Sequence, residues 1–150
     1  MAGGSVPPTM RGMSSVDVAR PAILDAWASA WSALDLQRVL SLFTDDCIYE
    51  DVALGVVNRG KDQLRAFGDA FLAGVPDLKV ELKESFATEN RAAVEWVMSG
   101  THSGDLPGMP ATGKAFSIRG STVCELEGGE IRRNSDYWDL SGFLKQLGLQ

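Results

Sequence analysis

Apolar residues recur at intervals of three and four along the first half of the chain, which is the spacing that one face of an α-helix requires. Asp17 and Pro21 precede the first stripe and are typical of a helix start, and Asp35 is placed to cap the second. Gly74 and Pro76 end the third stripe. The pattern predicts three helices, of which the first two form an αα-hairpin. Their expected inward-facing residues are Ile23, Trp27, Trp31 and Leu34, then Leu36, Val39, Leu40 and Phe43, then Leu64, Phe67, Phe71 and Leu72.

A short strand is expected between the second and third helices. Asp45 and Asp46 follow the second stripe and are predicted to stop that helix, after which the chain runs as a strand to Asp51. Gly55 and residues 58–60, which read Asn-Arg-Gly, are turn formers and predict that the chain turns before the third helix begins. Asp51 therefore lies at the far end of the strand, among apolar neighbours.

The apolar period changes from helical to two after Asp77, which indicates strands. Residues 103–113 form a loop long enough to act as a lid. Three helices followed by a meander of strands predict an α+β fold, in which a curved, mostly antiparallel sheet wraps round the helices as a cone with a pocket at its mouth. The strands are predicted at residues 78–83, 91–102, 114–126 and 131–138, with a hairpin turn at 127–130 and a short closing helix at 140–147.

Composition places this fold in one domain. The chain has 150 residues, 45% of them apolar, and we expect a single domain over residues 21–150 and a disordered leader over residues 1–20. A net charge of −6 with dispersed Lys and Arg argues against a nucleic-acid partner. Because the sequence shows no membrane-spanning run and no signal peptide, we expect a cytoplasmic protein without a membrane partner, in which Cys47 and Cys124 are buried, reduced thiols.

Asp51 is the first candidate for chemistry. A carboxylate at the end of a strand, among apolar neighbours, can point into a pocket where desolvation raises its pKa toward that of a general base. The alternative is that Asp51 caps a turn or pairs with Arg59 at the surface.

His102 and Asp136 are two further catalytic candidates. His102 is the one histidine of the chain and its ordinary pKa suits an acid, a base or an enolate donor, although a structural role at a strand end is the alternative. Asp136 precedes Tyr137 and Trp138 and is placed either to orient His102 or Arg119, or to hold a strand turn.

Inward-facing aromatic and apolar residues are the candidate pocket lining, since aromatic rings make good walls for a flat ligand. Plain core packing is the alternative for Trp27 and Trp31. One histidine and two scattered cysteines do not supply a metal site, and neither a Gly-x-Ser-x-Gly elbow nor a phosphate-binding loop is present, so we expect no metal and no cofactor. The predicted substrate-binding residues are Trp27, Trp31, Tyr49, Phe67, Trp96, Met98, Phe116, Ile118 and Thr122.

Several motifs in the second half of the chain resemble one family. Over residues 22–150 the chain resembles the SnoaL-like polyketide cyclases, also called ester cyclases, of the nuclear transport factor 2-like and ketosteroid isomerase-like superfamily. The motifs that carry the resemblance are Gly-Thr-His-Ser-Gly at 100–104, Gly-Met-Pro-Ala-Thr-Gly-Lys at 108–114, Gly-Glu-Ile at 129–131, Asp-Tyr-Trp-Asp-Leu at 136–140 and Leu-Lys-Gln-Leu-Gly-Leu at 144–149.

The resemblance implies a cone-shaped α+β barrel, a homodimer, a hydrophobic small-molecule substrate and no cofactor. SnoaL-like cyclases close a ring by intramolecular aldol chemistry with a His and an Asp, and His102 matches the family histidine. Where the family places its aspartate, residues 115–119 read Ala-Phe-Ser-Ile-Arg and offer no carboxylate. Asp51 or Asp136 is the expected substitute.

Residues 42–51 also resemble the ketosteroid isomerase segment that ends in that enzyme's general base, with Asp51 at the base position. Trp27 and Thr122 stand at the matching oxyanion positions, and because they offer only an indole N–H and a hydroxyl, ketosteroid isomerisation is not expected. Two other functions stay open: a non-catalytic pocket for an apolar metabolite, and an epoxide hydrolase that uses Asp51, Arg119 and Asp136 around a water.

Overall fold

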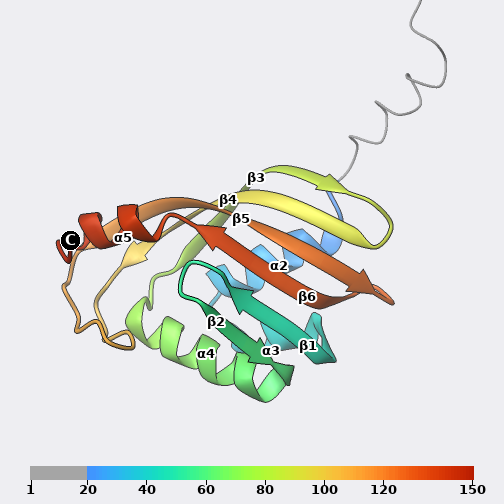
Figure 1. Cartoon of the computed structure of the whole chain (residues 1–150), viewed down its shortest axis with the longest axis horizontal. Coiled ribbons are helices and arrows are strands. Elements are labelled where there is room, and N and C mark those ends of the chain that lie inside the picture. The colour runs from blue at the N-terminus through green and yellow to red at the C-terminus, as the bar shows by residue number, and fades with distance from the viewer. Residues whose placement is uncertain (1–19) are drawn as a thin grey trace, which may run out of the picture.

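The structure is a computed structural model that describes residues 20–150, so the predicted leader, apart from Arg20, lies outside the described residues. Figure 1 shows a six-stranded sheet with three helices beneath it and a fourth at its end. The elements in chain order are α2 (Ala22–Ser32), α3 (Leu36–Ser41), β1 (Phe43–Asp51), β2 (Val56–Arg59), α4 (Gly60–Gly74), β3 (Lys79–Ala87), β4 (Arg91–Thr101), β5 (Ala115–Glu127), β6 (Glu130–Trp138) and α5 (Leu140–Gln146).

The three predicted N-terminal helices are present, with two corrections at their ends. Asp35 caps α3, and its carboxylate accepts the Arg38 N–H at 3.1 Å. Leu34, which we placed in the first apolar stripe, has a φ of 59° and is 40% exposed in the turn that follows α2. The prediction that Asp45 and Asp46 stop the second helix is wrong, because α3 ends at Ser41 and both acids lie exposed within β1.

A short strand replaces one of the predicted turns. Residues 58 and 59 belong to β2, which pairs antiparallel with β1 and places Val56 opposite Asp51. The turn itself lies just before β2, where Gly55 has a φ of 69° that favours glycine. Four residues carry too short a pattern for period-two alternation to be visible in the sequence.

The strand order is β2-β1-β6-β5-β4-β3. Strands β3 to β6 form the predicted antiparallel meander, whereas β1 pairs parallel with β6. This parallel pairing is decisive for the site because it sets Asp51 beside Asp136 on the neighbouring strand. Two carboxylates far apart in the sequence thus share one end of the sheet.

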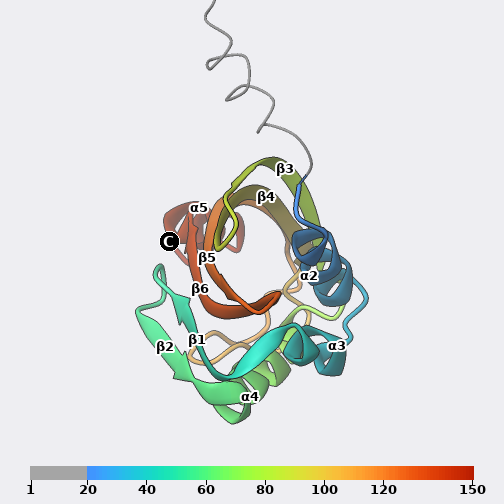
Figure 2. The ribbon, with the colours of Figure 1, turned by 90° about the vertical axis from the view of Figure 1, so that its right-hand side faces the viewer.

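The sheet curves strongly but does not close into a barrel. Figure 2 shows the strands curling round, with α2 and α3 on the side that the sheet leaves open. Gly120 lets the Trp96 ring pack closely against β5, because a Cβ at Gly120 would lie only 2.4 Å from that ring. The core lies between the concave sheet face and the helices, which confirms the predicted α+β fold. Within residues 20–150, no helix is both long and apolar enough to cross a membrane.

Candidate active site

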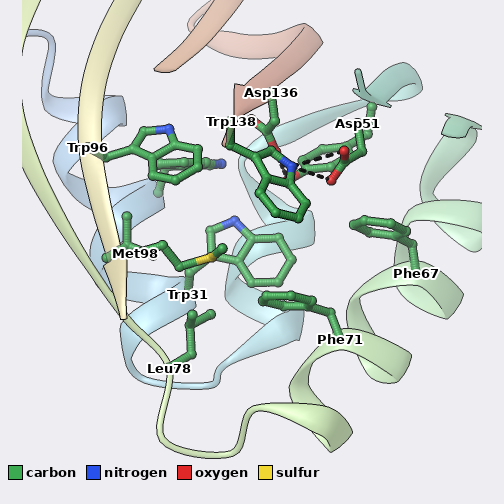
Figure 3. Close-up of a pocket in the computed structure, with 12 residues that line it drawn as sticks. Trp31, Asp51, Phe67, Phe71, Leu78, Trp96, Met98, Asp136 and Trp138 are labelled. Carbon is green, nitrogen blue, oxygen red and sulfur yellow. Dashed lines mark hydrogen bonds between the residues drawn. The ribbon is translucent and has the colours of Figure 1, made fainter. Parts of the chain in front are cut away.

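An apolar cavity of about 50 Å³, here called the inner cavity, lies between the helices and the concave face of the sheet. Figure 3 shows its lining residues, which come from α2, from α4 and from the strands β1, β3, β4 and β6, with Leu78 just before β3. Aromatic rings make up most of the wall, and among the described residues the carboxylates in it are Asp51 and Asp136. The full lining is Trp27, Trp31, Tyr49, Asp51, Phe67, Phe71, Leu78, Val80, Trp96, Met98, Asp136 and Trp138.

Asp51 ends β1 and is buried, with 5% of its surface exposed. Its carboxylate accepts the Trp138 indole N–H, which lies 3.0 Å from each oxygen, and the Leu54 backbone N–H at 2.9 Å (Figure 3). Asp51 therefore caps the turn after β1 and also lies in the wall of the cavity. The alternative pairing with Arg59 at the surface is not formed, because Asp51 is buried and its carboxylate is bound by Leu54 and Trp138. Burial raises the pKa of Asp51 above its ordinary value of 3.8, and the hydrogen bonds from Leu54 and Trp138 partly oppose that rise.

Asp136 lies deeper and at the centre of a hydrogen-bond network. One of its carboxylate oxygens accepts the Thr122 hydroxyl at 2.6 Å and the Asn134 amide at 2.8 Å, and the other accepts the Tyr49 hydroxyl. Thr122 in turn accepts the Trp96 indole N–H at 2.8 Å. Burial raises the pKa of Asp136 to about 6, although the three hydrogen bonds act in the opposite direction.

The two acids differ in how many hydrogen bonds their carboxylate oxygens accept from the protein. Asp136 accepts three hydrogen bonds from side chains, whereas one Asp51 oxygen accepts only its share of the forked Trp138 bond. A carboxylate oxygen can accept two hydrogen bonds, so Asp51 retains capacity on the cavity side. The charge of Asp51 also helps to raise the pKa of Asp136, as the smallest of its causes.

A second, outer cavity of about 560 Å³ adjoins the inner one. Phe67, Phe71 and Trp138 line both cavities and so form the partition between them. This outer space has the size of typical small-molecule pockets, whereas the inner one admits only a small group. Its remaining lining is Leu54, Val56, Asn58, Gln63, Ala66, Ala70, Leu106, Pro107, Met109 and Phe143.

His102 lines neither cavity. It is fully buried just after β4, and both of its ring nitrogens bind the following loop: Nε2 lies 3.2 Å from the Met109 carbonyl oxygen and Nδ1 lies 3.1 Å from the Thr112 hydroxyl. Because a carbonyl only accepts, Nε2 donates to Met109. The structure thus places His102 away from the cavity that Asp51 and Asp136 line, with hydrogen bonds of the kind that its structural alternative predicts.

Three predicted lining residues also lie away from the cavities. Phe116 packs edge-on against Phe143 with their ring centroids 4.8 Å apart, Ile118 is buried in the core, and the Thr122 hydroxyl is used by Asp136. These three residues point to the same face of the sheet as the residues that line the cavity. At these positions, however, β5 contributes to the core, because α5 covers its end. The other six predicted residues, Trp27, Trp31, Tyr49, Phe67, Trp96 and Met98, line the inner cavity.

The position of the Arg119 side chain rules out the arrangement that an epoxide hydrolase would require. Its side chain is 84% exposed and lies 3.6 Å from Glu95, so it points away from Asp51 and Asp136. Residues 119 and 118 alternate across the sheet, and Ile118 occupies the inward position. An Asp-Arg-Asp cluster around a water is therefore not formed.

Sequence reasoning missed four lining residues of the inner cavity: Phe71, Leu78, Val80 and Trp138. Phe71 was recognised as inward-facing, but a periodic pattern does not separate core from cavity wall. Trp138 carried a stronger signal, since it ends a strand two residues after Asp136 and so shares its face. Among the described residues, its indole is the one side-chain donor to Asp51.

The part of the chain that the structure describes holds no group of residues suited to metal or thiol chemistry. Residues 20–150 contain no group of three or more His, Cys, Asp or Glu placed to hold a metal ion. Cys47 and Cys124 are free and buried, as predicted, and burial raises the pKa of Cys124 to about 12. Neither thiol has the depressed pKa of a nucleophilic cysteine.

A curved sheet packed against helices, with an apolar pocket that holds two buried carboxylates, is an architecture of the ketosteroid isomerase-like type. The chain belongs to the SnoaL-like polyketide cyclase family, whose model matches residues 22–147. This finding confirms the resemblance seen in the sequence motifs.

Known relatives agree with this assignment. The chain is 35% identical over 117 residues to an aklanonic acid methyl ester cyclase of Streptomyces peucetius, covering 70% of this chain and 79% of the relative. It is 30% identical over 106 residues to a cyclase of Calcarisporium arbuscula, covering 70% and 75% of the two chains. Among solved structures, a protein of ketosteroid isomerase-like fold from Catenulispora acidiphila, in complex with trimethylamine, matches with a TM-score of 0.78 at 26% identity over 88% of this chain and 96% of its own.

Proposed function

We propose that this protein is a cofactor-independent cyclase that closes a ring in a hydrophobic carbonyl compound by an intramolecular aldol-type reaction. The observation that carries the proposal is Asp51, a buried carboxylate with raised pKa and free hydrogen-bonding capacity, in an aromatic cavity. A base of this kind suits the removal of a proton alpha to a carbonyl. The names of the two curated relatives, both cyclases, support the same reaction class.

The reaction needs one proton removed and one returned. Asp51 takes the alpha proton, and the resulting enolate carbon attacks a second carbonyl of the same molecule, which forms the new carbon–carbon bond. The attacked oxygen becomes an alkoxide and takes a proton, which leaves a hydroxyl. Asp136 is the nearest second acid in the cavity, and its pKa of about 6 lets it carry that proton near neutral pH. Asp51 then releases its proton to solvent and Asp136 takes one up, which restores the starting protonation of both acids. The sum is an isomerisation, with no oxidant and no cofactor consumed.

The two cavities divide the substrate into two parts. The body of a polycyclic substrate fits the outer cavity, where apolar residues of α4 and of residues 103–113 form the walls. Only a small reacting arm passes the partition of Phe67, Phe71 and Trp138 to reach Asp51. The apolar walls exclude water from the enolate, which strengthens the electrostatic interactions inside.

Replacing Asp51 by Asn tests the proposal most directly. Aklanonic acid methyl ester, the compound in a relative's name, is the first test substrate, and the product is a new chromatographic peak of unchanged mass. We expect Asp51→Asn to lower kcat by about 1000-fold or more, since the general base is removed, while the affinity for substrate changes less than about threefold. Asp46→Asn is the matched control, because Asp46 is exposed on the same strand.

Equal turnover by the wild type and Asp51→Asn would remove Asp51 from the mechanism. Binding of the compound without turnover by the wild type, across a panel of aromatic methyl esters and ketones, would favour the non-catalytic pocket instead. Retention of activity after exhaustive dialysis against a chelator is expected, because none of these steps uses a metal.

We further propose a cytoplasmic homodimer. Two free, buried thiols suit a reducing compartment. The outer face of the sheet carries Val123 on β5 and Tyr137 on β6, which are 43% and 47% exposed and offer apolar surface to a second copy. Sedimentation velocity of the wild type and of Tyr137→Lys checks this: we expect a dimer that the lysine shifts toward monomer.

A further inference from the structure

Two tryptophans in the wall of the inner cavity each carry an indole N–H that the protein leaves without a partner. Among the described residues, five buried polar side-chain atoms have no hydrogen-bond partner: Arg20 Nε, Trp27 Nε1, Trp31 Nε1, Thr44 Oγ1 and Asn134 Oδ1. Only Trp27 and Trp31 belong to the wall of a cavity, and it is the inner one. Both indoles are almost completely buried, with 3% and 4% of their surface exposed.

An unpaired N–H in an apolar interior is costly, so two of them in one small cavity call for an explanation. The same wall holds two other indoles, and the protein satisfies both: Trp96 donates to Thr122 at 2.8 Å and Trp138 donates to Asp51 at 3.0 Å. The protein therefore provides a hydrogen-bond partner for one pair of indoles in this wall and none for the other pair. The sheet tryptophans are tied into the carboxylate network, and the helix tryptophans are not.

The two unpaired donors come from one face of one helix. Trp27 and Trp31 are four residues apart on α2, so their side chains lie one turn apart on the same side. Figure 3 shows the Trp31 indole lying across the pocket between Met98 and Trp138, whereas Asp51 and Asp136 enter from the strands. A rigid helix thus supplies the donors and the sheet supplies the acids.

We propose that the indole N–H groups of Trp27 and Trp31 form the oxyanion site of this enzyme. They hold the oxygen of the carbonyl whose alpha proton Asp51 removes, and they stabilise the negative charge that this oxygen acquires in the enolate. The inference rests on the proposed cyclase function. Thr122 cannot serve in this role, because its hydroxyl donates to Asp136 and the residue lies outside the cavity lining.

The charges in the cavity change in the required direction during this step. The proton moves from the substrate carbon to Asp51, so Asp51 becomes neutral when the enolate oxygen becomes negative. The total charge of the cavity stays the same, and only its position moves from the strand side to the helix side. Fixed, uncharged donors in a water-excluded site stabilise such developing charge without reorganisation.

Phenylalanine variants test the donors while keeping an aromatic ring in the wall. We expect Trp27→Phe and Trp31→Phe each to lower kcat by about 100-fold, as the loss of an oxyanion donor does, with KM within about threefold of the wild-type value. A purely structural role predicts the opposite split, with kcat preserved in the folded fraction and only Tm reduced. Unchanged kcat in both variants would overturn the proposal.

A binding measurement keeps the test independent of turnover. In Asp51→Asn, the asparagine imitates the neutral Asp51 that accompanies the enolate, and p-nitrophenolate imitates the delocalised oxyanion. Absorbance reports whether the probe binds ionised. We expect the phenolate to bind Asp51→Asn at least tenfold more tightly than the variant that also carries Trp27→Phe and Trp31→Phe.

The two tests separate this inference from the cyclase proposal. Phenolate binding that depends on the two tryptophans supports the oxyanion site even if the wild type fails to cyclise the test substrate. Equal phenolate affinity with and without the two indoles overturns the site, and leaves the cyclase proposal to the Asp51→Asn result. Circular dichroism of each variant establishes that the compared proteins are folded.

Discussion

Two buried regions, His102 after β4 and the Asp51–Asp136 pair near the ends of β1 and β6, use their hydrogen bonds in opposite ways. His102 lies just after β4 with both ring nitrogens bound to residues 103–113, and it faces neither cavity. Asp51 lies at the end of β1 with one carboxylate oxygen only partly engaged and turned toward the inner cavity. Burial alone therefore does not mark a group for chemistry. The group also needs unspent hydrogen-bonding capacity on the side where a ligand can reach it.

His102 still matters for the outer cavity. Its Nε2 holds the Met109 carbonyl, which also accepts the Leu106 N–H at 2.9 Å, and both Leu106 and Met109 line that cavity. Leu106 fits tightly against α4, since a Cβ at Gly74 would lie 2.4 Å from its side chain. His102 thus acts on the wall of the binding site, whereas Asp51 faces the reacting end.

The largest effect that separates the two buried regions is expected from Asp136→Asn. Asparagine preserves the shape of the network but cannot deliver a proton, so we expect kcat to fall by about 100-fold or more. Steady-state kinetics with the same test substrate measure this loss. A kcat within threefold of the wild-type value would assign Asp136 to structure, like His102.

The same variant has a second, opposite effect on stability. Because burial raises the Asp136 pKa from 3.8 to about 6, its contribution to stability is fully present below pH 3.8 and is lost as the pH rises through about 6. The difference corresponds to about 3 kcal/mol above pH 7. Asp136→Asn should therefore lose less unfolding free energy than the wild type between pH 4 and pH 8. Urea titrations at both pH values measure it, and parallel losses in the two proteins would contradict the buried, ionising Asp136.

A smaller effect, on substrate affinity and loop order, is expected from His102→Phe. Removing both ring nitrogens takes away the hydrogen bond that holds the Met109 carbonyl to His102. We therefore expect faster hydrogen exchange at the Leu106 and Met109 amides, and a loss of about 1–3 kcal/mol in unfolding free energy. The KM should rise by about fivefold, and kcat should stay within about threefold of the wild-type value. His102→Gln is the matched variant, because its amide can still donate to Met109. A kcat that falls 100-fold in both variants while exchange stays unchanged would return His102 to the reacting centre.

The smallest effect is expected from Thr112→Val. This change removes the partner of His102 Nδ1, together with the acceptor of the Lys114 N–H at 3.3 Å, and leaves the bond from Nε2 to Met109 in place. We expect a loss of about 1 kcal/mol in unfolding free energy and a KM within twofold of the wild-type value. Denaturant midpoints measure the first quantity, and a KM effect as large as that of His102→Phe would show that Nδ1, rather than Nε2, holds the cavity wall.

Local patterns predicted much of the architecture. The helical stripe through Trp27 and Trp31 and the alternation through Trp96 and Met98 identified elements whose inward faces are the ones observed, because a face that must be buried leaves a period in the sequence. The strand β2 escaped prediction because four residues are too few to show a period. The acidic pair Asp45 and Asp46 was misleading, since both residues are exposed in a stretch of β1 where the pairing with β6 is irregular, between Phe43 and Ile48.

The sequence by itself determined the fold class, the family and the six cavity residues that lie on strongly periodic faces, since these depend on local spacing and on motifs that lie within short stretches. Only the tertiary structure decided the chemistry of the site. The parallel pairing of β1 with β6 brings Asp51 beside Asp136, and the closing of residues 103–113 over His102 takes the histidine out of reach. Both depend on contacts between segments far apart in the chain, which no local period records.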